Sequence, residues 1–298
     1  DKKMRIAVGV FAAILLLSIA FYFTYMFLDY GDRSFVLSLA SELVFLLIIC
    51  CGLKVVYRQH IQFSFLCFIF GVPVGILFTQ VYLINYLGGT LDSGVGWASL
   101  MNEGLVLFCL GGLVSGTGHF LGGTEQIPVK PISTLSFCIV LFSLTGLMCL
   151  PTIYLYEFWF LVDLYTLQWC LIVLAFVGAI AFIKKGDFQS NFFRSFVLAF
   201  FICAGMATIS WYEVYPYAMS SETRYLIGPN FAVAILLLLY LSWSYIAYLL
   251  YLLKTNSFNS ISGELGVVNW HITEAYLFWF LICYGPATIV DIMGVIPS

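Results

Sequence analysis

Two glutamates lie within long apolar stretches of the sequence, where acidic side chains are rare. Glu42 falls in SLASELVFLL and Glu103 in SLMNEGLVLF. A charged carboxylate inside a membrane is costly, so both residues are hypotheses for a proton or ion pathway. A neutral, protonated glutamate that is hydrogen-bonded between helices costs far less, so a structural role is the alternative for each. No predicted span carries a central Arg or Lys to pair with them, which argues against a rotary-type proton channel.

The histidines and cysteines do not form a pattern typical of a metal or haem site. His60, His119 and His271 lie near the ends of apolar stretches, whereas a haem needs an axial ligand that faces inward from a span. The nine cysteines include no C-x-x-C pair, and nearly all lie in apolar runs. This favours small core residues over disulfides or metal ligands. We therefore expect no metal, no cofactor and no catalytic residue in this chain, and phospholipids as its ligands.

The elements that position these side chains are overwhelmingly apolar. The residues are 62% hydrophobic and 9% charged, and the mean hydropathy is +1.03. A soluble domain is typically about a quarter charged, so a water-exposed surface cannot be built from this composition. The net charge of -3 and the absence of a basic cluster longer than Lys184-Lys185 argue against a nucleic-acid partner. The composition predicts an all-α, polytopic transmembrane helix bundle.

Nine apolar stretches are each long enough to cross the hydrocarbon region as a helix. The breaks between them carry Gly, Asp, Pro and Lys residues that are typical of turns, and no loop is long enough to fold separately. We therefore predict a single transmembrane domain over residues 1–298. The predicted spans are residues 4–28, 34–57, 63–86, 95–117, 132–156, 160–183, 192–213, 226–253 and 270–293.

Basic residues predict the orientation of these spans, because inner-side loops collect Lys and Arg. With nine spans, ten of the twelve basic residues fall on the side of the amino terminus, and only Arg33 and Arg224 fall on the other. This asymmetry predicts an N-inside, C-outside topology. The ten residues are Lys2, Lys3, Arg5, Lys54, Arg58, Lys130, Lys184, Lys185, Arg194 and Lys254.

Small residues inside two spans give a weaker signal about packing. The spacings Gly71-x-x-x-Gly75 and Gly112-x-x-x-Gly116 would let neighbouring helices approach closely. This motif occurs in many bundles, so it says little about function. It does predict where the third and fourth spans meet other helices.

The last third of the chain carries a more particular pattern. A span closes with a glutamate, the connection before the last span contains another glutamate, and that span opens with Trp-His and an acid three positions later. These features resemble the C-terminal half of cytochrome c oxidase subunit III, mainly over residues 160–298. The matching residues are Glu213, Glu264, Trp270, His271 and Glu274.

The first half of the chain departs from this family. The resemblance implies a divergent first half, residues 1–156, followed by a subunit III-like second half, residues 157–298. The family has seven spans, so two further spans would lie in the first half, and the predicted topology would still agree. Neither Glu42 nor Glu103 inherits the role of the family's buried glutamate, because both lie on spans predicted to run in the opposite direction.

The motif formed by Trp270, His271 and Glu274 also has a physical interpretation that does not depend on the family. Trp270 and His271 would place amphipathic rings at the inner headgroup level, and Glu274 would lie one turn further along the same helix face. Such groups can hydrogen-bond a lipid headgroup or a neighbouring subunit. We expect the same contacts, with a lipid headgroup or a neighbouring subunit, from Glu213, Arg224 and Glu264.

These observations favour one hypothesis and leave others open. The resemblance implies a non-catalytic, cofactor-free subunit packed against the haem-copper catalytic subunit of a terminal oxidase. It would support assembly, lipid placement and sustained proton uptake, in the mitochondrial inner membrane or, alternatively, a bacterial inner membrane. The alternatives are a secondary transporter or channel that uses Glu42 or Glu103, and an accessory subunit of another energy-converting complex. An enzyme of lipid metabolism is disfavoured because few polar residues are available for acid-base chemistry.

Overall fold

The computed structural model describes residues 33–56, 61–89, 97–122, 133–155, 158–218, 227–255, 257, 261 and 263–295. The predicted first span, residues 4–28, lies outside them. All regular structure within the described ranges is helical, so the all-α prediction is confirmed. Eight of the helices are long and apolar enough to cross a membrane, which suggests an integral membrane protein. Each coincides with one of the predicted second to ninth spans.

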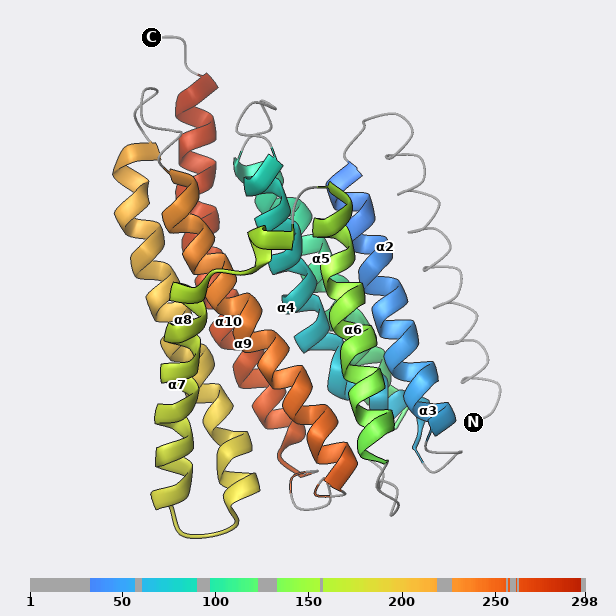
Figure 1. Cartoon of the computed structure of the whole chain (residues 1–298). Coiled ribbons are helices and arrows are strands. Elements are labelled where there is room, and N and C mark those ends of the chain that lie inside the picture. The colour runs from blue at the N-terminus through green and yellow to red at the C-terminus, as the bar shows by residue number, and fades with distance from the viewer. Residues whose placement is uncertain are drawn as a thin grey trace.

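The helices follow one another up and down through the bundle (Figure 1). The second span is composite, because a π-helical turn, Ile48–Gly52, joins α2 to α3. A 3₁₀ turn, Phe158–Leu161, lies in the connection between α6 and α7. The bounds are α2 Arg33–Leu47, α3 Leu53–Val56, α4 Phe63–Gly89, α5 Trp97–Phe120, α6 Thr134–Leu155, α7 Leu164–Ile183, α8 Phe188–Ala218, α9 Ile227–Thr255 and α10 Leu265–Val295.

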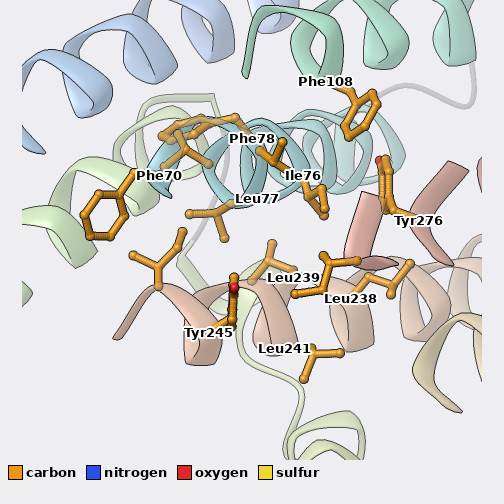
Figure 2. Packing of buried hydrophobic residues seen from close by; sticks show 14 of the residues in the cluster. Phe70, Ile76, Leu77, Phe78, Phe108, Leu238, Leu239, Leu241, Tyr245 and Tyr276 are labelled. Atoms are coloured by element: carbon orange, nitrogen blue, oxygen red, sulfur yellow. The ribbon is translucent and has the colours of Figure 1, made fainter. Parts of the chain in front are cut away.

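Helix α4 is the centre of the bundle. Its apolar window is buried along its whole length, and it packs against α2, α5, α6, α9 and α10. A helix that is apolar on all sides is typical of such a buried position. Figure 2 shows Leu77 of α4 facing a layer formed by Leu238 and Leu239 of α9, with Tyr276 of α10 at one side.

Helices α4 and α5 approach closely through small residues, as the glycine spacing of the third span predicts. A Cβ atom built on Gly71 would lie 2.5 Å from the backbone oxygen of Gly111 and 2.5 Å from the backbone nitrogen of Ser115. The prediction for Gly112-x-x-x-Gly116 is wrong for the described residues, none of which would lie within 4 Å of a Cβ on either glycine. A shift of one residue turns a helix by about 100°, so the contact face of α5 carries the preceding residues instead.

Helices α7 to α10 pack together as a second group, in which aromatic side chains fill the contact between α8 and α9. Phe193, Phe196 and Phe200 of α8 all lie against Tyr245 of α9, with ring centroids 5.1 to 6.1 Å apart. The outer faces of α6 and α7 carry many exposed apolar side chains. In a membrane such faces meet lipid or another protein.

Helix α10 begins five residues earlier than the sequence predicts. The backbone N–H groups of Glu264 and Leu265 both donate to the carbonyl of Ile261, which starts the helix at this turn. Leu265 and Asn269 are buried, and the Tyr245 hydroxyl donates to the Asn269 side chain at 2.7 Å. Tertiary burial therefore extends the helix into a stretch whose polar residues indicate a loop, and Trp270 and His271 lie in its second turn.

Candidate functional site

Glu42 lies on the face of α2 that packs against α4. Its side chain is 0% exposed, and neither carboxyl oxygen has a hydrogen-bond partner among the described residues. The aromatic rings on the same helix face show what Glu42 faces. Phe35 meets Tyr82 of α4 edge to face, with centroids 5.6 Å apart, and Phe45 meets Phe78 in the same way at 5.3 Å. Glu42 lies between these two contacts and therefore points toward α4.

Glu103 of α5 contacts the hydroxyl end of Tyr82. The Tyr82 hydroxyl donates a hydrogen bond to a carboxyl oxygen of Glu103, and Tyr82 is itself fully buried. One turn earlier on α4, the Thr79 hydroxyl donates to the carbonyl of Gly104 at 3.1 Å. The structure therefore brings Glu103 against Tyr82 of α4, while Glu42 faces α4 from α2.

The three residues lie at a similar depth in the bundle. Antiparallel packing places the beginnings of α2 and α5 and the end of α4 at the same end of the molecule (Figure 1). Glu42, Tyr82 and Glu103 are nine, seven and six residues from that end of their helices, which corresponds to roughly 9 to 14 Å. A membrane-spanning helix of this length would hold them well inside the hydrocarbon region.

Further buried polar atoms without partners occur around the same helices. Ser38 lies one turn before Glu42 on the same face of α2, and its buried hydroxyl has no partner among the described residues. Proteins rarely leave buried polar groups unpaired, and a water or ion is the usual explanation where they do. In the described part of the chain, the other side chains with such atoms are Gln80, Asn85, Thr152 and Trp279.

Gln80 shows that the polar atoms continue on the far side of α4. Its amide nitrogen donates to the Tyr276 hydroxyl of α10 at 2.9 Å, whereas its carbonyl oxygen has no partner in the described structure. Trp279 lies one turn further along α10 and is also fully buried. Polar groups therefore surround α4 at its contacts with both α2 and α10.

A second group of charged residues lies at the end of the bundle where α10 begins. Arg194 of α8 forms a two-point ion pair with Glu264, since its Nε and Nη2 atoms contact the two carboxyl oxygens. This hydrogen bonding from Arg194 holds the pKa of the Glu264 carboxyl below its ordinary value. Sequence reasoning did not identify Arg194 as the partner, because the two residues are far apart in the chain.

The Trp-His motif lies close to this ion pair on α10. His271 Nδ1 is 2.7 Å from a carboxyl oxygen of Glu274, so these two residues share a helix face, as their spacing predicts. Trp270 is 62% exposed, and its ring is available to lipid or to another protein. We call Arg194, Glu264, Trp270, His271 and Glu274 the α10 entry cluster.

The remaining predicted residues do not join either group. Glu213 belongs to the final turns of α8, but its side chain lies outside the described part of the structure, and so does Arg224 altogether. His119 is exposed near the end of α5, with its ring 5.2 Å from Phe68. Asp163 caps α7 by accepting a hydrogen bond from the Thr166 backbone N–H at 3.0 Å, which is a structural role.

Comparison with known proteins gives no further guide to the site. The chain matches no protein-family model, no curated protein and no solved structure. Within the described ranges, no group of three or more His, Cys, Asp or Glu side chains could hold a metal ion. The fold and composition define an integral membrane protein of helical type, and its function has to be argued from the site itself.

Proposed function

We propose that this protein is a transporter or channel that binds a proton or a small monovalent cation at Glu42. The observation that carries this proposal is the complete burial of a carboxylate whose oxygens have no partner among the described residues. An isolated charge in an apolar interior costs many kcal/mol. Glu42 is therefore stable in two neutral states, one that holds a proton and one that holds a cation.

The neighbouring groups fit a site that exchanges these two states. Ser38 lies one turn away on the same face and has a hydroxyl that is free to contact a bound cation or water. Tyr82 and Glu103 form a second hydrogen-bonded polar pair, at the contact between α4 and α5. A proton relay through a membrane uses carboxylate and hydroxyl groups of this kind.

The proposal includes the nine-span, N-inside and C-outside topology. The elements that carry Lys54, Lys184 and Lys254 end together at one end of the bundle (Figure 1). Arg33, the first residue of α2, belongs to the opposite end. Inner-side loops collect basic residues, so this distribution supports an inner side at the end where α10 begins.

Ion flux into proteoliposomes tests the proposal. The purified chain is reconstituted, a pH or K⁺ gradient is applied, and a pH-sensitive dye reports the flux across the membrane. We expect Glu42→Gln to lower the flux at least tenfold, because the amide keeps the shape but cannot exchange a proton or hold a cation. Glu274→Gln changes an exposed carboxylate near the beginning of α10; it is the matched control and should retain the flux. Equal flux in wild type and Glu42→Gln, or no flux above protein-free vesicles, would overturn the proposal.

A second candidate function is that of an accessory subunit of a haem-copper terminal oxidase. The α10 entry cluster favours it, because residues that resemble cytochrome c oxidase subunit III gather at one end of the bundle. Broad apolar faces on α6 and α7 offer room for a neighbouring subunit. In this reading the chain itself is not catalytic and binds no cofactor. It packs against the catalytic subunit with phospholipids, in a mitochondrial or bacterial inner membrane.

Co-purification distinguishes this second function from the first. Mild detergent extraction from the native membrane should bring a haem a-type spectrum and a catalytic subunit together with the chain. The double variant Trp270→Ala/His271→Ala should weaken this association, whereas Glu42→Gln should not. A monodisperse particle without haem would overturn the oxidase function and leave the transport proposal to the flux experiment.

A further inference from the structure

Two cysteines from different spans lie side by side in the bundle. Cys50 Sγ is 3.7 Å from Cys67 Sγ, and the two residues are 2% and 8% exposed. Cys50 belongs to the π-helical turn that joins α2 to α3, and Cys67 lies in the second turn of α4. The other cysteine of the π-helical turn, Cys51, is exposed. Only one of two consecutive thiols therefore faces α4.

The local packing explains how the two sulfur atoms meet. A π-helical turn holds one more residue than an α-helical turn, and here it turns Ile49, Cys50 and Leu53 inward. On the other side, α5 presses against α4 next to Cys67, because a Cβ on Gly118 would lie 2.9 Å from the Cys67 Cβ atom. Cys67 is thus held on a rigid pair of helices, while Cys50 lies on an irregular turn.

We propose that Cys50 and Cys67 are a dithiol site that a peroxide oxidises to an intramolecular disulfide. This inference goes beyond the proposed function and does not depend on Glu42. A disulfide bond requires an S–S separation of about 2.05 Å, so the two sulfur atoms must approach by less than 2 Å from their present contact. The π-helical turn is the element that can move, because its hydrogen bonding differs from that of the regular helices on either side.

The oxidation consumes one peroxide and releases two waters. One thiol attacks the peroxide, whose O–O bond breaks to give a sulfenic acid on that cysteine and one water. The second thiol then attacks the sulfenic sulfur, the S–S bond forms, and the hydroxyl group leaves as the second water. Two electrons pass from the two sulfur atoms to the peroxide, and both thiol protons end in water. A thiol reductant reverses the reaction by thiol-disulfide exchange.

Cys50 and Cys67 lie at a depth in the bundle that a small neutral oxidant can reach. Cys67 is about one turn from the beginning of α4, and Cys50 is about two turns from the end of α3. Hydrogen peroxide is uncharged and enters such a position without the penalty that a charged oxidant would meet. A disulfide is also neutral, so it adds no charge to the apolar interior.

Peptide mapping of the whole protein tests the inference. The chain is purified in detergent under a reductant, which is then removed, and it is treated with hydrogen peroxide and digested without reduction. We expect one cross-linked peptide that joins Cys50 to Cys67, the loss of two of the nine free thiols, and recovery of both after a dithiol reductant is added.

Two variants make the result specific. Cys51→Ser removes the exposed neighbour and should leave the cross-link unchanged. Cys67→Ser should abolish it and leave a sulfenic acid on Cys50 that a dimedone probe captures. A cross-link from Cys51 instead of Cys50 would overturn the inference. So would thiols at Cys50 and Cys67 that stay reduced at a peroxide concentration that oxidises Cys51. These readouts are independent of ion flux, so failure here leaves the transport proposal intact.

Discussion

Glu42 and Glu264 are the same residue type in opposite surroundings. Glu42 is fully buried against α4 and has no partner among the described residues, whereas Glu264 lies at the end of the bundle and is held by two nitrogen atoms of Arg194. Where water can reach, the chain pairs its charges. In the buried interior, no described residue neutralises the Glu42 carboxylate, which leaves a proton or a bound ion for that role in the transport proposal. This contrast is why the transport proposal rests on Glu42.

The largest expected effect comes from a permanent change of charge at Glu42. Glu42→Lys would place an ammonium group in the middle of α2, where a basic residue costs about 3 kcal/mol in a membrane. We expect the variant to lose about that much stability, measured by thermal unfolding in detergent, or to fail to accumulate. The matched change Glu274→Lys on the exposed part of α10 should shift stability by no more than about 0.5 kcal/mol. Equal effects at both positions would remove the contrast between the two regions.

A smaller effect is expected from Tyr82, the tyrosine that contacts the intramembrane Glu103. Tyr82→Phe removes the hydroxyl that donates to Glu103 and keeps the ring that meets Phe35. Loss of a partner for a partly buried group costs about 1 to 3 kcal/mol. Unfolding of this variant should therefore occur at lower temperature than that of Tyr251→Phe, a tyrosine that is exposed on α9. If the two variants unfold together, Tyr82 does not support Glu103.

The smallest effect concerns the pH dependence of the Arg194–Glu264 pair. Because Arg194 lowers the pKa of Glu264 in the folded protein, the pair adds stability above the unfolded carboxyl pKa of about 4.3. That stability is lost as the pH falls through the lower pKa of the folded state. Both side chains are partly exposed, so solvent screening limits the contribution to about 1 kcal/mol or less.

Thermal unfolding of wild type and Glu264→Gln at several pH values checks this prediction. The wild type should be slightly more stable than the variant at pH 7, and the difference should shrink below about pH 4.3, where the Glu264 carboxyl of the unfolded chain binds a proton before that of the folded protein does. High salt should reduce the difference further, because the pair is near the surface. A difference that grows as the pH falls would contradict the assignment of Arg194 as the partner.

The sequence predicts the helices of this protein well, for a simple physical reason. Each span must bury its own backbone polar groups inside a membrane, so long apolar runs and turn residues mark the helix limits directly. The largest differences are at α8, which is Phe188–Ala218 against a predicted 192–213, and at the beginning of α10, where Asn269 is polar and its burial depends on Tyr245 of another helix. The contact face of α5 is predicted wrongly for a similar reason, because small residues on both faces fit the same spacing.

The candidate site was predictable only in part. An acid within an apolar run identifies Glu42 and Glu103, because such residues are rare in spans. Nothing in the local pattern indicates that Tyr82 donates to Glu103, or that Arg194 meets Glu264. The cysteines were predicted as core residues; this holds for Cys50 and Cys67, which are buried, and is wrong for Cys51 and Cys109, which are exposed. Their contact depends on a π-helical turn that the sequence does not indicate.

The sequence by itself determined that the chain is apolar and helical, and which few residues in it carry charge. These properties follow from composition and local spacing, which act along one helix at a time. The tertiary structure decided which of those residues meet, because the rotation and depth of each helix are set by side chains on its neighbours. That packing buries Glu42 without a hydrogen-bond partner among the described residues. It also brings Arg194 to Glu264 and Cys50 to Cys67.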